Sequence, residues 1–205
     1  MKLALASDGA AVPADVIDLL AVAGLPTAPL RSASGPALIA ADGMEWLVAS
    51  GEDVLAVCVA GGVDAGIVGK ELLLEHGLDL SELLDLQVAR QRLVYARTAS
   101  GTRPGRHRLR IATRYPRATR RHFAHSGRQV DPLTLAAPGL AVALGLADGV
   151  VELEHLLPRG EAELVVCEQI ALCGARLVTG RQARALHSAG LSTLVDSLRA
   201  AQVDM

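Results

Sequence analysis

The sequence predicts an α/β fold. Short apolar runs alternate along the chain with segments in which apolar residues recur at helical spacing, a pattern typical of β-α-β units. The chain has 205 residues, of which 51% are apolar, so it can bury the core of one ordinary domain or of two small ones. Because only 2% of the residues are aromatic, that core is expected to consist of Ala, Val and Leu.

The first part of the chain predicts a strand and a helix, then a hairpin, then a helix followed by another strand. Pro13 is tolerated in the first turn of a helix, and Gly24 ends the helix that follows it. Asp42-Gly43 is a turn signal between two apolar strands. Strands are expected at residues 3–6, 37–40, 45–48 and 64–70, the last running into another helix, and helices over 13–24 and 53–59.

The second part, from Arg90 onward, predicts a further α/β unit. The helix that closes the chain carries an apolar stripe that includes Leu191, Leu194 and Leu198. The polar residues 100–105 are the nearest thing to a linker. Strands are expected at residues 92–96, 109–112, 129–135, 150–153, 163–167 and 175–178, and helices over 119–125 and 181–201.

Positive charge is concentrated in one segment. Residues 97–128 contain ten arginines and no Asp or Glu, so this segment carries +10 and, with a chain total of −2, the rest carries −12. Such a segment attracts anions. It contains only two aromatic residues, Tyr115 and Phe123, and no nucleic-acid recognition motif, and the chain has a pI of about 6.3. We therefore expect small anions and no nucleic acid as its partners.

Apolar stretches are too short for a membrane span, which needs roughly 18–20 residues. Asp8 falls where a signal peptide would have the middle of its apolar region. We therefore expect a cytoplasmic protein that does not interact with membranes.

Cysteine and histidine spacing predicts no metal site and no catalytic triad. The three cysteines are an odd number and lie among apolar neighbours, so we expect buried free thiols and no disulfide. The histidines of the basic segment are expected at the surface. These residues are Cys58, Cys167 and Cys173, and His107, His122 and His125.

Four ordered blocks between about residues 60 and 150 form a more specific pattern. They are Asp64–Glu75 (DAGIVGKELLLE), Glu82–Leu86, the pair Arg90–Val94 and Arg110–Pro116 with Thr119 and Phe123, and Gly145–Asp148. In their order and spacing they resemble the short form of ATP phosphoribosyltransferase, the first enzyme of histidine biosynthesis. The length of the chain also agrees with the short form.

The resemblance implies two α/β domains like those of type II periplasmic binding proteins, with the active-site cleft between them. The terminal helix returns to the first domain, so the expected domains are residues 1–90 plus 180–205 and residues 91–179. The implied reaction joins N1 of ATP, or of a related base or nucleotide in a specialised pathway, to phosphoribosyl pyrophosphate (PRPP) and releases pyrophosphate. The resemblance also implies Mg²⁺ as cofactor and a homodimer or larger oligomer, with or without a regulatory subunit.

Site residues follow from the matching positions. The resemblance makes Asp148 a catalytic contact to the phosphoribosyl group, although a carboxylate satisfied by amides at the start of a strand explains it equally well. Lys70 lies at a strand-to-helix junction, where backbone N–H groups favour anions, but a solvated lysine in the first turn is the alternative. The expected substrate- and nucleotide-binding residues are Lys70, Arg90, Arg92, Arg114, Tyr115, Asp148 and Glu152. The other arginines of the basic segment are expected on a solvated face: Arg103, Arg106, Arg108, Arg117, Arg120, Arg121 and Arg128.

Three loops depart from the family pattern. Residues 6–9 read Ala-Ser-Asp-Gly where catalytic members have Pro-Lys-Gly-Arg. Residues 152–158 (ELEHLLP) replace a Thr-Gly-x-Thr-Leu loop that cradles a phosphate, and residues 136–140 replace a Ser-Gly-x-x-Glu stretch. Fewer donors and added carboxylates disfavour phosphate binding. An alternative function is therefore a catalytically impaired paralogue that binds nucleotides or other anions as a regulatory partner.

Overall fold

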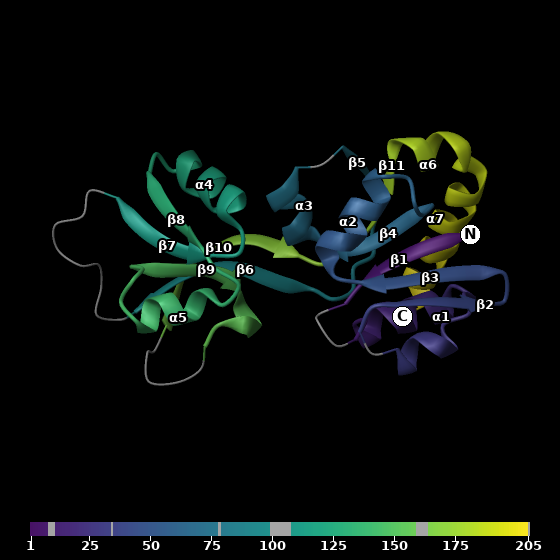
Figure 1. Ribbon diagram of the computed structural model, residues 1–205, viewed down its shortest axis with the longest axis horizontal. Helices are drawn as coiled ribbons and strands as arrows, with labels where there is room; N and C mark the ends of the chain where they lie inside the picture. Colours follow the sequence, from purple (N-terminus) through teal and green to yellow (C-terminus); the bar gives the residue numbers. More distant parts are fainter. Residues whose placement is uncertain (8–10, 34, 78, 99–107, 159–163, 205) are drawn as a thin grey trace. The chain divides into compact units, whose positions relative to one another are not determined.

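The chain folds into two compact units. The computed structural model describes residues 1–7, 11–33, 35–77, 79–98, 108–158 and 164–204 (Figure 1). One unit consists of Met1–Leu73, Gly77–Arg90 and Gly174–Met205, and the other of Leu74–His76 and Gln91–Cys173. The chain thus returns to the first unit at Gly174, whereas from the sequence we expect this return at residue 180.

A six-stranded sheet with the order β2-β3-β1-β4-β11-β5 organises the first unit. Strand β1 pairs in parallel with β3 and β4, whereas β2, β11 and β5 are antiparallel to their neighbours. The strands are β1 (Lys2–Ala6), β2 (Ala37–Ala41), β3 (Met44–Ala49), β4 (Ala65–Gly69), β5 (Leu80–Asp85) and β11 (Ala175–Gly180). The helices are α1 (Ala14–Val22), η1 (Ala28–Ser32), α2 (Gly51–Val59), α6 (Arg181–Leu186), α7 (Ser188–Asp204) and the start of α3 (Lys70–His76). The last three residues of α3, Leu74–His76, belong to the second unit.

Helices cover both faces of this sheet. The chain moves from β1 to β3 through α1, η1 and β2, and from β3 back across β1 to β4 through α2, so the two connections run in opposite directions. Crossovers of the usual right-handed sense then place α1 and α2 on opposite faces. Leu3 and Leu5 pack in the core with α1 and α7, whereas the intervening Ala4 packs in the core with α2. Gly66 allows α2 to approach closely, because a Cβ there would lie 2.5 Å from Cys58 Sγ.

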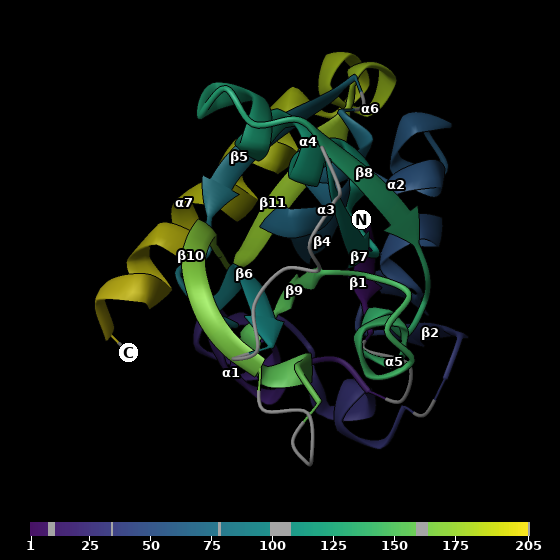
Figure 2. The same ribbon diagram turned by 90° about the vertical axis from the view of Figure 1, so that its left-hand side faces the viewer.

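A five-stranded sheet with the order β10-β6-β9-β7-β8 organises the second unit. Strands β8, β7 and β9 are parallel, and β6 and β10 complete the sheet in antiparallel pairing, with β10 at the edge beside β6 (Figure 2). The strands are β6 (Gln91–Thr98), β7 (Leu109–Thr113), β8 (Val130–Thr134), β9 (Gly149–Leu153) and β10 (Leu164–Cys173), and the helices are α4 (Pro116–His125), α5 (Pro138–Ala143) and η2 (Glu154–Leu156).

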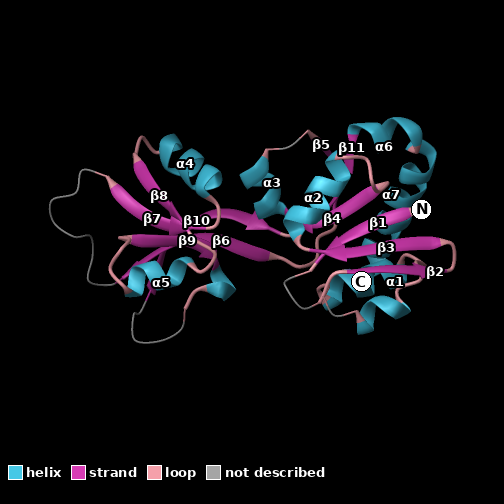
Figure 3. Cartoon of the chain, viewed as in Figure 1, coloured by secondary structure: helices cyan, strands magenta, loops and turns pink. Residues whose placement is uncertain are grey.

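Helices α4 and α5 lie on opposite faces of this second sheet (Figure 3). Tyr95 on β6 packs edge-to-face against Phe123 of α4, with ring centroids 5.1 Å apart. The next residue, Ala96, points to the other face and joins the core formed with Ala141 and Val142 of α5. The period of two along a strand therefore divides the core of this unit into two layers.

Most of the expected elements are confirmed, including the hairpin turn, where Asp42 and Gly43 have positive φ angles of 45° and 77°. The expected helix over 181–201 is instead two helices, because His187 has φ −122° and ψ 26°, outside helical values. Strand β5 and helix α5 were not expected. One cysteine expectation is wrong: Cys58 and Cys173 are buried, but Cys167 is exposed, on the edge strand β10.

Burial removes water from the Cys58 thiol and raises its pKa to about 12, so this cysteine is an inert part of the core. No helix of the described residues is long and apolar enough to cross a membrane.

Candidate functional site

The carboxyl ends of strands β7 and β9 form a topological switch point in the second unit. From β7 the chain crosses through α4 to β8 on one side, and from β8 it crosses back through α5 to β9 on the other. In open α/β sheets ligands bind where the strand order reverses in this way, at the carboxyl ends of the strands. Arg114 and Tyr115 follow β7 at this edge, and Glu152 lies near the end of β9.

Arg114 and Glu152 form a bidentate ion pair at this edge. Arg114 Nε and Nη2 donate to Glu152 Oε2 and Oε1, each over 2.9 Å. The Glu152 side chain is only 4% exposed, whereas that of Arg114 is 36% exposed. A buried carboxylate needs such a partner, because an unpaired charge would be costly there. Leu153 N also donates to Glu152 Oε1 over 2.8 Å, and Arg114 Cζ lies 5.7 Å from the centre of the Tyr115 ring.

Two buried threonines hold the backbone of this loop. Tyr115 N donates to Thr113 Oγ1 over 2.9 Å, and Thr119 Oγ1 donates to Tyr115 O over 2.7 Å. Pro116, at the first helical position, starts α4 directly after Tyr115. The sequence comparison with the family included Thr119, but its role in holding the loop follows only from these contacts.

Arg92 and Glu154 form a second bidentate pair near the same edge. Strand β6 runs antiparallel to β9, with Leu93 opposite Leu153, which brings Arg92 beside the start of η2. Arg92 Nε donates to Glu154 Oε2 over 2.6 Å, and Arg92 Nη2 donates to Glu154 Oε1. Both side chains are exposed, Arg92 by 48% and Glu154 by 36%.

Asp148 lies at the opposite end of β9. Its carboxylate accepts a hydrogen bond from Arg110 N over 2.8 Å, and its own N–H donates to Arg110 O over 2.7 Å. At ~3.3 Å per residue along a strand, Asp148 and Glu152 are about 13 Å apart. The structure therefore brings Arg92, Arg114, Tyr115 and Glu152 to one edge of the sheet but leaves Asp148 at the start of the strand, bonded to an amide.

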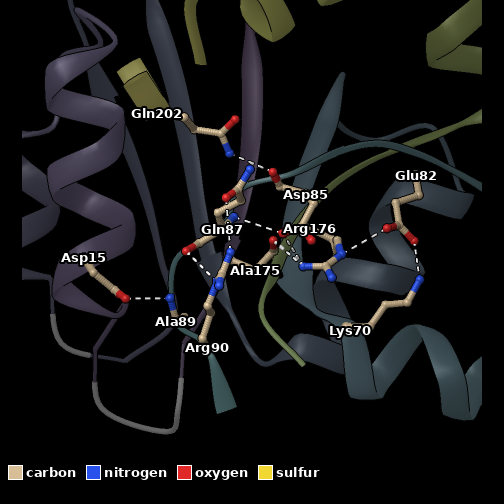
Figure 4. A network of polar contacts seen from close by, with 10 residues as sticks. All are labelled: Asp15, Lys70, Glu82, Asp85, Gln87, Ala89, Arg90, Ala175, Arg176 and Gln202. Carbon is tan, nitrogen blue, oxygen red and sulfur yellow. Dashed lines mark hydrogen bonds and ion pairs between the residues drawn. The ribbon is translucent and has the colours of Figure 1, made fainter. Parts of the chain in front are cut away.

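Lys70 belongs to a network of ion pairs in the first unit (Figure 4). Its Nζ lies 2.5 Å from Glu82 Oε2, while Glu82 Oε1 accepts from Arg176 Nε over 3.0 Å. Arg176 Nη1 also donates to Asp85 over 2.6 Å, and Arg176 is 9% exposed. The network attaches the start of α3 to the edge strand β5 and to β11.

Arg90 lies in the same region and bonds to Gln87, with Arg90 Nε and Nη2 each 3.1 Å from an oxygen of that residue (Figure 4). Gln87 and Ala89 have positive φ angles of 59° and 51°, which side-chain-bearing residues adopt at a cost. Asp15 helps to hold this turn, because its carboxylate accepts from Ala89 N over 2.5 Å.

Several arginines expected on a solvated face also have specific partners, and Arg117 and Arg121 are exposed as expected. Arg117 Nη1 donates to His76 O, and Arg121 Nη2 donates to Leu74 O over 3.2 Å, so α4 supplies donors to the last turn of α3. In return, the buried Glu75 carboxylate accepts from the N–H groups of Arg117 and Ala118 at the start of α4, over 2.8 and 3.0 Å. Arg103 and Arg106 lie outside the described residues, as does Asp8.

Arg128 is the third of these arginines, and it binds Glu168 on β10 through two hydrogen bonds of 2.6 Å. His122 Nε2 lies 2.9 Å from the same carboxylate, and the Arg128 guanidinium covers the Phe123 ring at 4.4 Å. The hydrogen bonds from Arg128 are the largest cause that lowers the Glu168 pKa from 4.5 to about 2. Sequence reasoning assigned no role to Glu75, Glu154 and Glu168, because no local signal marks a carboxylate whose partner lies 40 or more residues away in the chain.

The fold of the chain indicates the class of protein to which it belongs. Two α/β units are typical of type II periplasmic binding proteins, and solved structures of that kind match 98% of the chain. One is the periplasmic aliphatic sulphonate binding protein SsuA from Escherichia coli, with a TM-score of 0.57 at 13% identity over 98% of this chain and 72% of that one. This likeness concerns the fold alone.

The chain belongs to the ATP phosphoribosyltransferase family. The family model for ATP phosphoribosyltransferase (HisG) matches residues 50–200. The ATP phosphoribosyltransferase from Halorhodospira halophila is 36% identical over 195 residues, which cover 91% of this chain and 89% of that one. The one from Pseudomonas putida is 33% identical over 192 residues, which cover 91% of this chain and 90% of that one. The ATP phosphoribosyl transferase (HisG:HisZ) complex from Thermotoga maritima has a TM-score of 0.77 at 21% identity, covering both chains fully.

Proposed function

We propose that this chain catalyses the transfer of a phosphoribosyl group from PRPP to N1 of ATP, the first step of histidine biosynthesis. The new bond joins N1 of adenine to C1 of the ribose. The bond that breaks joins C1 to the pyrophosphate oxygen, and its electron pair leaves with pyrophosphate. The observation that carries this proposal is the Arg114–Glu152 pair at the switch point of the second sheet, in a chain of this family.

The chemistry requires cations that bind the phosphate groups of both substrates. Arg114 suits that role at the nucleotide, because its guanidinium is held by Glu152 and remains 36% exposed. Glu152 is then the residue that aims Arg114, and the ring of Tyr115 lies close to the guanidinium. We assign Lys70, Arg90 and Arg92 to the remaining phosphate groups of the two substrates. Arg90 and Arg92, like Arg114, match positions that bind the nucleotide in the family. Asp148 is a positioning residue in this proposal, since its carboxylate bonds the backbone of β7.

Magnesium is implied by the family, but the described residues do not supply a site of their own. No group of three or more His, Cys, Asp or Glu residues among them is arranged to hold a metal ion. Mg²⁺ in enzymes that act on polyphosphates is held largely by substrate phosphates and water. In our proposal the ion therefore enters with PRPP or ATP as part of the substrate, and no protein residue is assigned to it.

A pyrophosphate-release assay with ATP, PRPP and Mg²⁺ tests the proposal. It compares the wild-type chain with Arg114→Ala and with a matched control, Arg110→Ala. Arg110 belongs to the same unit but lies at the opposite edge of the sheet, where its side chain pairs with Asp131 over 3.2 Å. We expect pyrophosphate release that needs both substrates and that falls in Arg114→Ala but not in the control. Equal rates in the two variants would contradict the assignment of Arg114.

A second candidate is a catalytically impaired paralogue that binds anions as a regulatory partner. The ion pairs favour it, because both Arg92 and Arg114 are already neutralised by carboxylates. The structurally similar Thermotoga maritima protein was solved as a HisG:HisZ complex, so we propose that this chain also assembles with further subunits, as a homo-oligomer or with a regulatory chain. Nucleotide binding without pyrophosphate release, with and without such a partner, would establish this second function. Either function places the protein in the cytoplasm.

A further inference from the structure

The two arginine–carboxylate pairs at this edge of the second sheet, Arg114–Glu152 and Arg92–Glu154, differ in how readily they can open. Glu152 is 4% exposed and would be left as a buried charge without Arg114. Glu154 is 36% exposed and Arg92 is 48% exposed, so water can solvate both groups when this pair separates. Exposed ion pairs contribute little to stability and are weakened by salt. The Arg92–Glu154 pair is therefore the one that a ligand can displace.

The carboxylate of Glu154 also occupies two of the N–H donors that Arg92 could offer to a phosphate. It engages Arg92 through Nε and Nη2, the two-pronged arrangement in which a guanidinium binds either a carboxylate or a phosphate. One pair of N–H groups cannot serve both partners at once. A substrate phosphate at this position also meets the negative charge of Glu154 for as long as the pair is closed.

We propose that Glu154 determines the affinity of this site by competing with substrate phosphate for Arg92. The inference rests on the proposed function, because it assumes that Arg92 contacts a substrate phosphate. Glu154 acts as a built-in anion: it holds Arg92 in place in the free protein, and it must release Nε and Nη2 before a phosphate can bind these two donors. Removing the charge of Glu154 therefore strengthens phosphate binding, even though glutamate is not a residue type that is expected in a phosphate site.

Calorimetric titration with PRPP and, separately, with ATP tests this competition in the full chain. Glu154→Gln keeps the size of the side chain and removes its charge. We expect its dissociation constant for at least one ligand to be about two- to tenfold lower than that of the wild type at low salt, with a smaller difference at high salt. Glu154→Ala should change the affinity in the same direction.

Two further variants separate the specific competition from a general change in charge. Asp131→Asn removes one negative charge from the same unit at the opposite edge of the sheet, where Asp131 pairs with Arg110, and should leave both affinities unchanged. In an Arg92→Gln background, Glu154→Gln should bring no gain, because the contested guanidinium is absent. Unchanged or weaker binding in Glu154→Gln, or a gain that persists without Arg92, would overturn the inference while the proposed function stands. Failure of the wild type and every variant to bind either ligand would overturn both.

Discussion

Glu75 caps helix α4 at Arg117, and Arg117 in turn caps the helix that carries Glu75. Glu75 Oε2 accepts from Arg117 N over 2.8 Å, while Arg117 Nη1 donates to the carbonyl of His76, the last residue of α3. Each helix end has backbone groups that lack partners within the helix, and here each helix satisfies those of the other. The contact therefore fixes the start of α4, directly after the loop that contains Arg114 and Tyr115.

Replacing Glu75 with Ala should lower the free energy of unfolding by about 1–2 kcal/mol, because the variant loses an N-terminal cap that is buried. Urea denaturation followed by circular dichroism measures this change. Asp196→Ala is the control, since Asp196 is exposed and lies 4.0 Å from Arg199, and it should change stability by less than about 0.5 kcal/mol. Equal stability of the two variants would show that the cap contributes nothing.

Replacing Arg114 with Ala should weaken the binding of ATP or AMP by about 1–3 kcal/mol, because charge-assisted bonds to phosphate are among the stronger polar contacts. The variant should also be less stable, since Glu152 loses its partner while buried. Calorimetry gives the first quantity and denaturation the second. A dissociation constant unchanged from the wild type would remove Arg114 from the nucleotide site.

Acid should weaken the attachment of β10 to α4 through Glu168. The folded-state pKa of this group is lowered to about 2, mainly by hydrogen bonds from Arg128, so the pair stabilises the protein fully above the ordinary pKa of 4.5 and loses this effect as pH falls toward 2. The free energy of unfolding of Glu168→Gln should therefore lie below that of the wild type near neutral pH. The difference should shrink between about pH 4.5 and 2, and a difference that stays constant down to pH 2 would contradict the assignment.

Turnover of ATP with PRPP should be slow in the isolated chain. Residues 155–158 (His-Leu-Leu-Pro) stand where the family has hydroxyls and a glycine, and removing a single preorganised donor commonly lowers a rate by about 10²–10³. Building the family's Thr-Gly-x-Thr sequence into these four positions should tighten PRPP binding. A wild-type turnover of order one per second would show that other groups supply the missing donors.

Local sequence signals predicted the elements of this fold well where they were strong. Asp42-Gly43 identified the hairpin turn, and Pro13 and Gly24 marked the limits of the first helix closely. Helix α5 was missed because Pro138 and Gly139 in its first turn look like breakers, although proline is tolerated there. The break at His187 was missed because the apolar stripe suggests one continuous helix.

The sequence by itself determined the α/β class, the order of the main elements and the family, because periodicity, turn residues and ordered motifs are local properties of the chain. Only the tertiary structure decided which carboxylate each arginine binds. Arg114 pairs with Glu152, 38 residues away, and Arg92 with Glu154, 62 residues away. These pairings depend on strand order and register, which long-range crossovers and core packing set. For the same reason only the structure shows that the Asp148 carboxylate bonds the backbone of Arg110, 38 residues away, at the end of β9 opposite to Glu152.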